Sequence, residues 1–324
     1  MRFSSTLASI GTVAVLLASP FSSAQAAYSQ IIAFGDSLSD NGNLFSRTQP
    51  ALGAGIPAAP YFNGRFSNGP VAVEVMAQTL GVSLVDYAYG GALTGVSNRI
   101  PLPGLLDNTG LQGQVNAFTG GLASQGKTAD ASALYFLWGG GNDFFSSTNP
   151  VATAGTVIAN LTSELGQLYG SGAREFFVPL LPDMSYSAEV IAAGATAQAQ
   201  AHQFSLGFNG ALSNALVATQ GALAGSNIHI FDVGSVLAQV RSDLTAQGGN
   251  VTTGCWSGNY FGTNGGTLCS DSTKYFLWDN VHPTAGVHDA VGHAMAAAVP
   301  EPETTGLALV GLMLVGVVVS RRRV

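Results

Sequence analysis

The sequence predicts an α/β fold in which helices cover both faces of a parallel β-sheet. Five short apolar runs are bounded by glycine, aspartate or proline, which is typical of buried strands. These runs lie at residues 30–34, 83–87, 133–138, 175–180 and 227–233. Helical patterns alternate with them along the chain, and strands that alternate with helices form parallel sheets covered on both faces.

Amphipathic patterns predict the helices that connect these strands. They lie at residues 71–80, 156–169, 186–223 and 236–246. A last helix is predicted to start at Pro283, because proline suits a first helical position, and to run towards Ala298. In such sheets ligands bind beyond the carboxyl ends of the strands. The functional site is therefore expected in the turns that follow the first three strands.

Composition and charge narrow the class of protein. Hydrophobic residues make up 47% of the 324 residues, which is enough for a large core and excludes global disorder. The formal net charge is -7. A partner with a phosphate backbone needs a surplus of Lys and Arg on the protein, so no nucleic-acid partner is expected.

Residues 1–26 have the pattern of a secretory signal peptide. Arg2 supplies the positive region, residues 10–17 supply most of the apolar region, and Ala24 and Ala26 form a small-residue cleavage site. The alternative is an uncleaved anchor, but the apolar run is short for a span and is followed by Pro20. Cleavage is therefore expected near Ala26.

Residues 300–324 combine three features in order: Pro300-Glu301-Pro302, an apolar stretch at 304–320, and three terminal arginines. This order resembles the PEP-CTERM sorting signal of Gram-negative bacteria. The resemblance implies transient anchoring by a C-terminal transmembrane helix and removal of the tail by an exosortase-type protease. A plain tail anchor is the alternative. In both cases the arginines stay cytoplasmic, so the protein is expected to be exported across the inner membrane and to be periplasmic, on the cell surface or secreted.

The part between these ends, residues 27–299, is expected to form one domain. Its only cysteines are Cys255 and Cys269. An oxidising compartment makes a disulfide between them the default. Two cysteines without nearby histidines are too few for a structural zinc site, so no metal is expected.

Four short motifs place polar residues where a site is expected. The first three each follow a predicted strand, and the fourth lies near the end of the domain. They are FGDSLSDNGN at 34–43 with Ser37, AYGGA at 88–92 with Gly91, GGGND at 139–143 with Asn142, and WDNVHP at 278–283 with Asp279 and His282. Because the carboxyl ends of parallel strands meet at one edge of the sheet, these residues are expected to converge.

Residues of these types can perform nucleophilic acyl transfer. The Ser37 hydroxyl is a weak nucleophile unless a base removes its proton, and His282 can be that base. Asp279, three residues earlier, can hold one ring nitrogen and fix the tautomer. The oxyanion of the tetrahedral intermediate needs preorganised donors. The backbone N–H groups of Ser37 and Gly91 and the side-chain amide of Asn142 can supply them.

On these motifs the chain resembles the GDSL (SGNH) esterase/lipase family. The four sequence motifs of that family match FGDSLSDNGN, DYAYGGA, GGGND and WDNVHPT. The family's sequence between its first and third motifs also resembles two stretches of this chain: YFNGRFSNGPVAVEVMA at 61–77 and LQGQVNAF at 111–118. The resemblance covers about residues 30–298. It implies a three-layer α/β/α SGNH-hydrolase fold with a five-stranded parallel sheet in flavodoxin-like order, and a reaction without cofactor or metal.

The same resemblance implies a role for each residue that the motifs single out. Ser37, Asp279 and His282 would form the catalytic triad. Ser37, Gly91 and Asn142 would form the oxyanion hole. These roles agree with those inferred from the chemistry of the side chains.

Other motifs and titratable residues have simpler interpretations. Residues 121–128 (GLASQGKT) satisfy the P-loop pattern, but they precede a predicted strand instead of following one. No GxSxG or GxGxxG motif occurs. Asp36, Asp40 and Asp143 are interpreted as residues that cap turns and support the site. Four further histidines lack partners at metal-ligand spacing and are interpreted as structural or surface residues: His202, His229, His288 and His293.

Three hypotheses for function follow from this sequence. The first is an exported serine esterase or lipase that hydrolyses carboxylic esters through an acyl-enzyme at Ser37. The second is an O-acetylesterase that acts on extracellular polysaccharide, and the third is a non-catalytic envelope or matrix protein. The expected substrates are small-molecule, lipid or acetylated-glycan esters. The complete set of site residues favours an enzyme.

Overall fold

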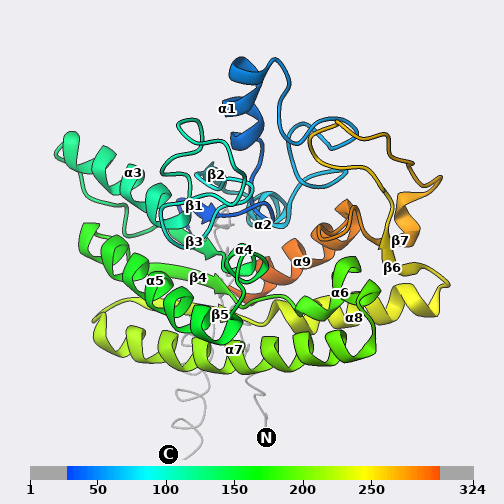
Figure 1. Ribbon diagram of the computed structural model, residues 1–324. Helices are drawn as coiled ribbons and strands as arrows, with labels where there is room; N and C mark the ends of the chain where they lie inside the picture. Colours follow the sequence, from blue (N-terminus) through cyan, green and yellow to red (C-terminus); the bar gives the residue numbers. More distant parts are fainter. Residues whose placement is uncertain (1–27, 300–324) are drawn as a thin grey trace, which may run out of the picture.

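The computed structural model describes residues 28–299 (Figure 1). The expected signal peptide at 1–26 and the expected sorting segment at 300–324 fall outside the described residues, and both stay predictions. Between residues 28 and 299 no helix combines the length and the apolar character that crossing a membrane would require.

A five-stranded parallel sheet forms the centre of the fold, as predicted. Its strand order is β2-β1-β3-β4-β5, which is the flavodoxin-like order. The strands are β1 (Gln30–Gly35), β2 (Ser83–Asp86), β3 (Leu134–Trp138), β4 (Glu175–Pro179) and β5 (Asn227–Phe231). All five coincide with the predicted apolar runs to within two residues at either end. The central strand β3 is buried along its whole length, whereas the edge strand β2 is only partly covered.

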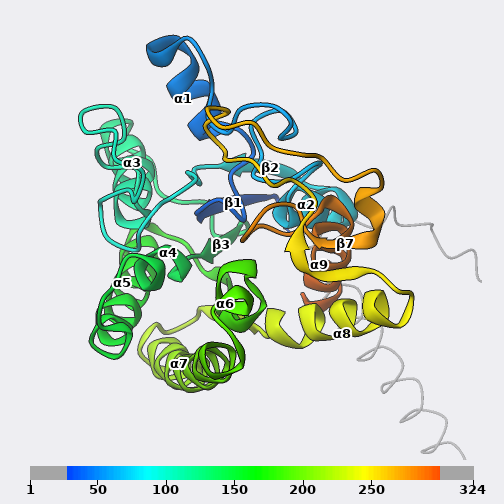
Figure 2. The same cartoon turned by 45° about the vertical axis from the view of Figure 1, so that its right-hand side comes forward.

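Helices cover both faces of the sheet, which gives three layers (Figures 1 and 2). One face carries α2 (Ala72–Leu80), α8 (Val233–Ala246) and α9 (Ala285–Ala298), and the other carries α3 (Leu111–Ser124), α5 (Pro150–Ser171) and α7 (Ala195–Ala222). Alternate strand residues supply the two cores, because successive side chains in a strand point to opposite faces. In β1, Ile31 and Ala33 pack against the first set of helices, and Ile32 and Phe34 pack against the second.

Two helix predictions are corrected by the structure. The segment predicted as one helix at 186–223 is divided into a 3-10 turn η1 (Met184–Tyr186), a short α6 (Ala188–Ala192) and α7. Gly194, with φ of 96°, separates α6 from α7, a conformation that glycine adopts without a steric penalty. Pro283 is not the first residue of α9. It pairs with Leu277 in an isolated bridge, and the helix starts two residues later.

Several elements carry no strong sequence pattern and were not predicted. They are α1 (Asn43–Leu52), α3, α4 (Gly141–Phe145), η2 (Ser272–Lys274) and a small parallel pair formed by β6 (Asn250–Gly254) and β7 (Tyr275–Leu277). Helix α3 contains three glycines in 14 residues, and glycine is a poor helix former. Packing against the sheet through Val115 and Phe118 stabilises this helix in spite of its composition.

A third apolar cluster lies beyond the main cores, among the loops near α1 at the top of Figures 1 and 2. It joins Tyr61 and Phe66 to Trp278 and Cys255. The loop at 53–63 contacts the loop at 256–268, since the Ala58 N–H donates a hydrogen bond to the Tyr260 carbonyl at 2.8 Å. Cys255 and Cys269 form a disulfide across the second of these loops.

Candidate active site

The Ser37 and His282 side chains meet just beyond the carboxyl end of β1, although they lie 245 residues apart in the sequence. His282 Nε2 is 2.8 Å from Ser37 Oγ, and His282 Nδ1 is 2.7 Å from Asp279 Oδ2. An ionised carboxylate can only accept, so Nδ1 carries the hydrogen and Nε2 accepts from the Ser37 hydroxyl. All three side chains are buried. The structure therefore brings these three predicted residues within hydrogen-bonding distance of one another.

Asp279 is held as a carboxylate by four donors. Its Oδ1 accepts from the backbone N–H groups of Val281 and His282, each at 2.8 Å. Its Oδ2 accepts from the His282 ring and from the Tyr61 hydroxyl, each at 2.7 Å. Burial alone would raise the pKa of Asp279, but the His282 charge and the hydrogen bonds outweigh it and leave the pKa below its usual value. An ionised partner at this position fixes the orientation and tautomer of the imidazole.

Two aromatic residues that were not singled out from the sequence complete the surroundings of His282. Tyr61 donates to Asp279, and the ring of Phe66 lies 4.9 Å from the His282 ring, measured between centroids. Both residues lie in YFNGRFSNGP at 61–70. The likeness of this stretch to the family was the one available signal for them.

The same stretch fixes the turn that carries His282. The Ser67 hydroxyl donates to the Pro283 carbonyl at 2.9 Å, and Asn68 Oδ1 accepts from the Ala285 N–H at 2.8 Å. These contacts join residues more than 200 positions apart. They hold the turn and the start of α9 against the segment that follows Phe66.

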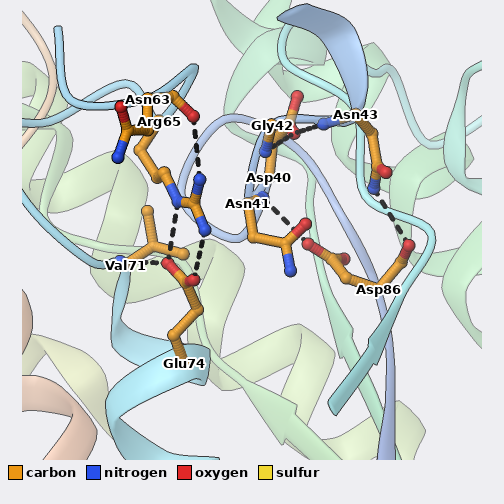
Figure 3. A network of polar contacts seen from close by, with 9 residues as sticks. All are labelled: Asp40, Asn41, Gly42, Asn43, Asn63, Arg65, Val71, Glu74 and Asp86. Atoms are coloured by element: carbon orange, nitrogen blue, oxygen red, sulfur yellow. Dashed lines mark hydrogen bonds and ion pairs between the residues drawn. The ribbon is translucent and has the colours of Figure 1, made fainter. Parts of the chain in front are cut away.

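An ion pair anchors this stretch to α2 (Figure 3). Arg65 contacts Glu74 at 2.6 Å and also donates to the Asn63 carbonyl at 2.8 Å. Glu74 in turn accepts from the Val71 N–H at 3.0 Å, just before α2 begins. The bidentate geometry of the arginine and carboxylate adds orientation as well as attraction.

Asp40 organises the loop that follows Ser37. Its carboxylate accepts hydrogen bonds from the N–H groups of Gly42, Asn43, Leu44 and Gly90. Figure 3 shows the part of this network near Asn43. Burial raises the pKa of Asp40 to about 6, and the four donors oppose that rise. Because Gly90 precedes Gly91, Asp40 ties the serine loop to the loop of the expected oxyanion hole.

Two further side chains brace the end of β1. Asp86 accepts from the Asn41 N–H at 2.9 Å (Figure 3). Gln114 in α3 both donates to the Gly35 carbonyl at 2.8 Å and accepts from the Gly35 N–H at 2.9 Å. These contacts fix the backbone on both sides of the turn that carries Ser37.

Asp36 accepts within its own turn, which agrees with its interpretation as a turn cap, whereas Asp143 bonds to a residue 49 positions away and joins two loops. Asp36 accepts from the Leu38 N–H at 3.0 Å, and Asp143 accepts from the Thr94 N–H at 3.0 Å. Burial raises the pKa of Asp36 to about 6, and the Leu38 hydrogen bond opposes it.

Gly91 and Asn142 lie around the same cavity as Ser37. Gly91 has φ of 78°, and a Cβ atom there would come within 2.5 Å of Asn98 Oδ1, so both conformation and space require glycine. Asn142 lies in the first turn of α4, and its Nδ2 donates to the Ala92 carbonyl at 3.1 Å. An amide nitrogen carries two hydrogens, so the second has no acceptor among the described residues.

The cavity beside Ser37 has a volume of about 380 Å³, which is within the usual range for small-molecule sites. Its walls include Ser37, His282, Gly91 and Asn142. Aromatic and aliphatic side chains supply much of the remaining surface. Every residue that the sequence assigned to the site, apart from the disulfide, lines this cavity.

The four remaining histidines form no metal site. Within residues 28–299 no group of three His, Cys, Asp or Glu side chains is placed to hold a metal ion. His288 is buried, and burial lowers its pKa to about 3, so it is neutral and its Nδ1 accepts from the Ala72 N–H. The other three lie beside acidic side chains: His202 by Asp183, His229 by Glu175 and His293 by Asp289.

Known proteins resemble this chain along most of its length. An Aeromonas hydrophila phosphatidylcholine-sterol acyltransferase is 25% identical, with 83% of this chain and 90% of the relative covered. A GDSL esterase/lipase of Arabidopsis thaliana is 26% identical, with 80% and 79% covered. A solved structure of a lipolytic protein of the G-D-S-L family from Veillonella parvula is 14% identical, with a TM-score of 0.44 over 83% of this chain and 97% of that one.

The family model described as GDSL-like Lipase/Acylhydrolase matches residues 31–295, which includes every residue of the serine, histidine and aspartate arrangement. The likeness to named esterases, lipases and acyltransferases also confirms the prediction of an ester-hydrolysing enzyme. The chain therefore belongs to the GDSL-like lipase/acylhydrolase family.

Proposed function

We propose that the protein is an exported serine esterase or lipase that hydrolyses carboxylic esters through an acyl-enzyme at Ser37. The observation that carries this proposal is a chain of two hydrogen bonds. Ser37 Oγ lies 2.8 Å from His282 Nε2, and His282 Nδ1 lies 2.7 Å from Asp279 Oδ2. The neighbouring cavity gives an ester access to the serine hydroxyl. Membership of an ester-hydrolysing family supports the same reaction.

In the first half of the reaction, Ser37 Oγ attacks the ester carbonyl carbon while His282 Nε2 takes the hydroxyl proton. The carbonyl oxygen becomes an oxyanion. The N–H groups of Ser37 and Gly91 and the free amide hydrogen of Asn142 would stabilise it, and one such donor is worth about 2.7–4 kcal/mol in the transition state. The carbon–oxygen bond then breaks, and the imidazolium returns the proton to the leaving alkoxide.

In the second half, a water molecule replaces the alcohol. His282 removes one proton from that water as its oxygen attacks the acyl carbon. Collapse of the second tetrahedral intermediate releases the carboxylic acid and restores the Ser37 hydroxyl. Asp279 holds the imidazolium through Nδ1 in both halves, so the ring returns to the same orientation after each proton transfer.

The expected location outside the inner membrane rests on the sequence of the two ends. Residues 1–26 would direct export, and residues 300–324 would anchor the chain until an exosortase-type protease removed the tail. The disulfide Cys255–Cys269 supports an oxidising compartment. Determination of the mature N- and C-termini by mass spectrometry tests this part, with Ala27 as the expected first residue. Recovery of intact residues 1–26 in the exported protein would contradict it.

The catalytic proposal is tested with p-nitrophenyl esters of graded chain length and with acetylated polysaccharide. Ser37→Ala is expected to lower turnover by at least about 10³-fold while the protein stays folded. Ser124→Ala, which removes an exposed serine hydroxyl on α3 that bonds only to the Gly121 carbonyl, is the matched control and is expected to keep full activity. Turnover retained in Ser37→Ala would overturn the proposal.

The same panel separates the alternatives. Acetate release from the polysaccharide without cleavage of longer acyl chains would favour an O-acetylesterase. Absence of turnover in the wild type on every ester would favour a non-catalytic envelope protein.

A further inference from the structure

One basic side chain differs from all the others that the structure describes. Of the eleven Lys and Arg residues, Arg2 and three terminal arginines lie outside residues 28–299. Six of the remaining seven have a polar partner: Arg47, Arg65, Lys127, Arg174, Arg241 and Lys274. The Arg99 guanidinium alone has no hydrogen-bond acceptor and no carboxylate within 4.0 Å among the described residues.

Arg99 is also the one Lys or Arg residue in the wall of the cavity that contains Ser37. Its side chain is exposed, and its guanidinium carbon lies 5.4 Å from the centre of the Phe145 ring, another residue of the wall. A planar guanidinium stacks on an aromatic face and still presents its N–H groups at its edges. The positive charge of Arg99 therefore lies at the site, and the N–H groups of its guanidinium have no acceptor among the described residues.

The backbone at Arg99 is fixed beside the expected oxyanion hole. Its N–H donates to the Gly91 carbonyl at 2.8 Å, and the preceding Asn98 side chain donates to the Gly90 carbonyl at 2.9 Å. The side chain therefore starts from a defined point next to Gly91. A group that Arg99 binds would lie in the cavity that Ser37 also lines.

The acidic residues in the cavity wall leave Arg99 without a counter-charge. Asp279 is occupied by its four donors, and Asp183 by His202 at 2.6 Å. Asp36 is buried next to Ser37, and Glu189 is exposed on α6. None of these carboxylates forms an ion pair with Arg99 among the contacts within residues 28–299.

The cavity surface is divided between polar and apolar side chains. Near Arg99 lies Tyr260, whose pKa is raised by burial against the opposing charge of Arg99. Ser257, Asn259 and Asn264 from the same loop add polar groups to the wall. Four apolar side chains from the C-terminal part of the domain also line the wall: Phe276, Leu277, Val287 and Val291. This combination suits a molecule with one charged end and one hydrocarbon end.

We propose that Arg99 binds an anionic group of the ester substrate, a phosphate or a carboxylate, so that the enzyme prefers anionic amphiphilic esters to neutral ones. This inference rests on the proposed esterase function and specifies its substrate class. Guanidinium suits these anions because its donors match the two oxygens of a carboxylate or phosphate. The chain has a net charge of -7, so its surface as a whole repels an anionic substrate. A single unpaired cation at the site attracts that substrate locally.

The first test compares hydrolysis of a lysophosphatidic acid with that of the monoacylglycerol carrying the same acyl chain. The measured quantity is the ratio of the two kcat/KM values. Arg99→Gln is expected to lower this ratio by about tenfold, which is about 1.4 kcal/mol, and Arg99→Lys is expected to lower it less. Lys127→Gln removes the same charge from an exposed turn outside the cavity and is expected to leave the ratio unchanged.

The second test measures binding and does not depend on turnover. Titration calorimetry is done with octyl phosphate, octanoate and 1-octanol on the wild type, Arg99→Gln and Lys127→Gln. Arg99→Gln is expected to lose about tenfold in affinity for the anionic ligands and little for the alcohol. Loss for octyl phosphate alone would identify phosphate as the anion, and loss for both would extend the site to carboxylates.

Equal affinities of wild type and Arg99→Gln for both anions, or the same loss in Lys127→Gln, would overturn the assignment of Arg99. That result would leave the esterase proposal standing. If the wild type instead bound the anions through Arg99 but hydrolysed no ester, the esterase proposal would fail by itself.

Discussion

The hydroxyl of Tyr61 shares one oxygen of Asp279 with the imidazole of His282. Both donors lie 2.7 Å from Oδ2, and Tyr61 lies 218 positions before Asp279 in the sequence. A hydrogen bond to a charged group contributes about 1.5–3 kcal/mol. Tyr61 therefore stabilises the ionised carboxylate and fixes its position relative to the ring, in addition to facing the cavity.

Tyr61→Phe is expected to lower the free energy of unfolding by about 1.5–3 kcal/mol and to make the protein more sensitive to acid. The pKa of Asp279 is depressed in the folded state, so its stabilising effect is present at neutral pH and is lost as the pH falls through the folded-state value. Removing a donor raises that value towards the unfolded one and so reduces the contribution, and the less stable variant is expected to unfold at a higher pH on acidification. Acid unfolding followed by circular dichroism measures the shift of the midpoint.

Tyr169→Phe is the matched control for that experiment. It removes an exposed tyrosine hydroxyl that donates to the Ala224 carbonyl at 3.0 Å, far from any carboxylate of the site. Its acid midpoint is expected to equal that of the wild type. An unchanged midpoint in Tyr61→Phe would show that the fourth donor does not affect Asp279.

Individual residues of the site differed in how well the sequence identified them. Ser37, Gly91, Asn142, Asp279 and His282 each lie in a short motif next to a strand or turn, so local pattern was enough to find them. Tyr61 and Gln114 act through contacts that only tertiary folding creates, and no local spacing marks them.

At the scale of elements, the disulfide loop connects the small β6–β7 sheet to the turn that carries Asp279. The Cys255 N–H donates to the Leu277 carbonyl at 3.0 Å, and the Trp256 N–H donates to the Trp278 carbonyl at 2.7 Å. Leu277 ends β7, and Trp278 immediately precedes Asp279. The disulfide thus closes the loop next to the strand that positions the aspartate.

Reduction of Cys255–Cys269 is expected to lower stability by about 3 kcal/mol, the loop-closure contribution for a 15-residue loop. In a domain of this size, that loss corresponds to a fall in Tm of roughly 6–12 °C. Esterase activity is expected to fall as well, because the strand before Asp279 loosens. Scanning calorimetry with and without reductant measures the change.

The double variant Cys255→Ala/Cys269→Ala controls for other effects of the reductant. It is expected to melt near the temperature of the reduced wild type and to show no response to reductant. A wild-type Tm that is the same before and after complete reduction would contradict this role of the disulfide.

The element boundaries show why the sequence predicted the sheet better than its surroundings. The inner strands β1, β3 and β4 each contain a continuous apolar run, because a parallel sheet is covered on both faces. The edge strands β2 and β5 mix apolar with polar residues. By contrast, α1 and α3 have few apolar residues or several glycines, and β6 is rich in threonine and asparagine. These elements depend on packing and on hydrogen bonds from distant segments, which a local pattern does not reveal.

At the scale of the whole molecule, one buried acid opposes folding. Glu164 in α5 is fully buried, and neither carboxyl oxygen has a hydrogen-bond partner among the described residues. Burial, followed by the charge of Asp143, raises the pKa of Glu164 well above its usual value. An unpaired buried polar group costs about 1–3 kcal/mol, so this side chain lowers the stability of the whole domain.

Glu164→Met is expected to raise the free energy of unfolding by about 1–3 kcal/mol at pH 7. A carboxyl whose folded-state pKa is raised destabilises the fold least below its unfolded pKa of about 4.3, where it is protonated in both states. The cost increases as pH rises through the folded-state value. The gain from the substitution is therefore expected to be larger at pH 8 than at pH 5. Urea unfolding at both values measures it.

Glu189→Met replaces an exposed glutamate of α6 and serves as the matched control. Its effect on stability is expected to stay within about 0.5 kcal/mol at either pH. A Glu164→Met protein that is less stable than the wild type at both pH values would mean that the carboxyl has a role in folding that its burial does not explain.

The most direct test of the central claim is covalent trapping of the nucleophile with a fluorophosphonate. If the Ser37 hydroxyl is activated by His282, the folded wild type is labelled at one site, peptide mass spectrometry locates the phosphonate on Ser37, and His282→Ala is labelled far more slowly. Labelling at another residue, or none in a folded wild-type protein, would contradict the assignment of Ser37 and His282 as nucleophile and base.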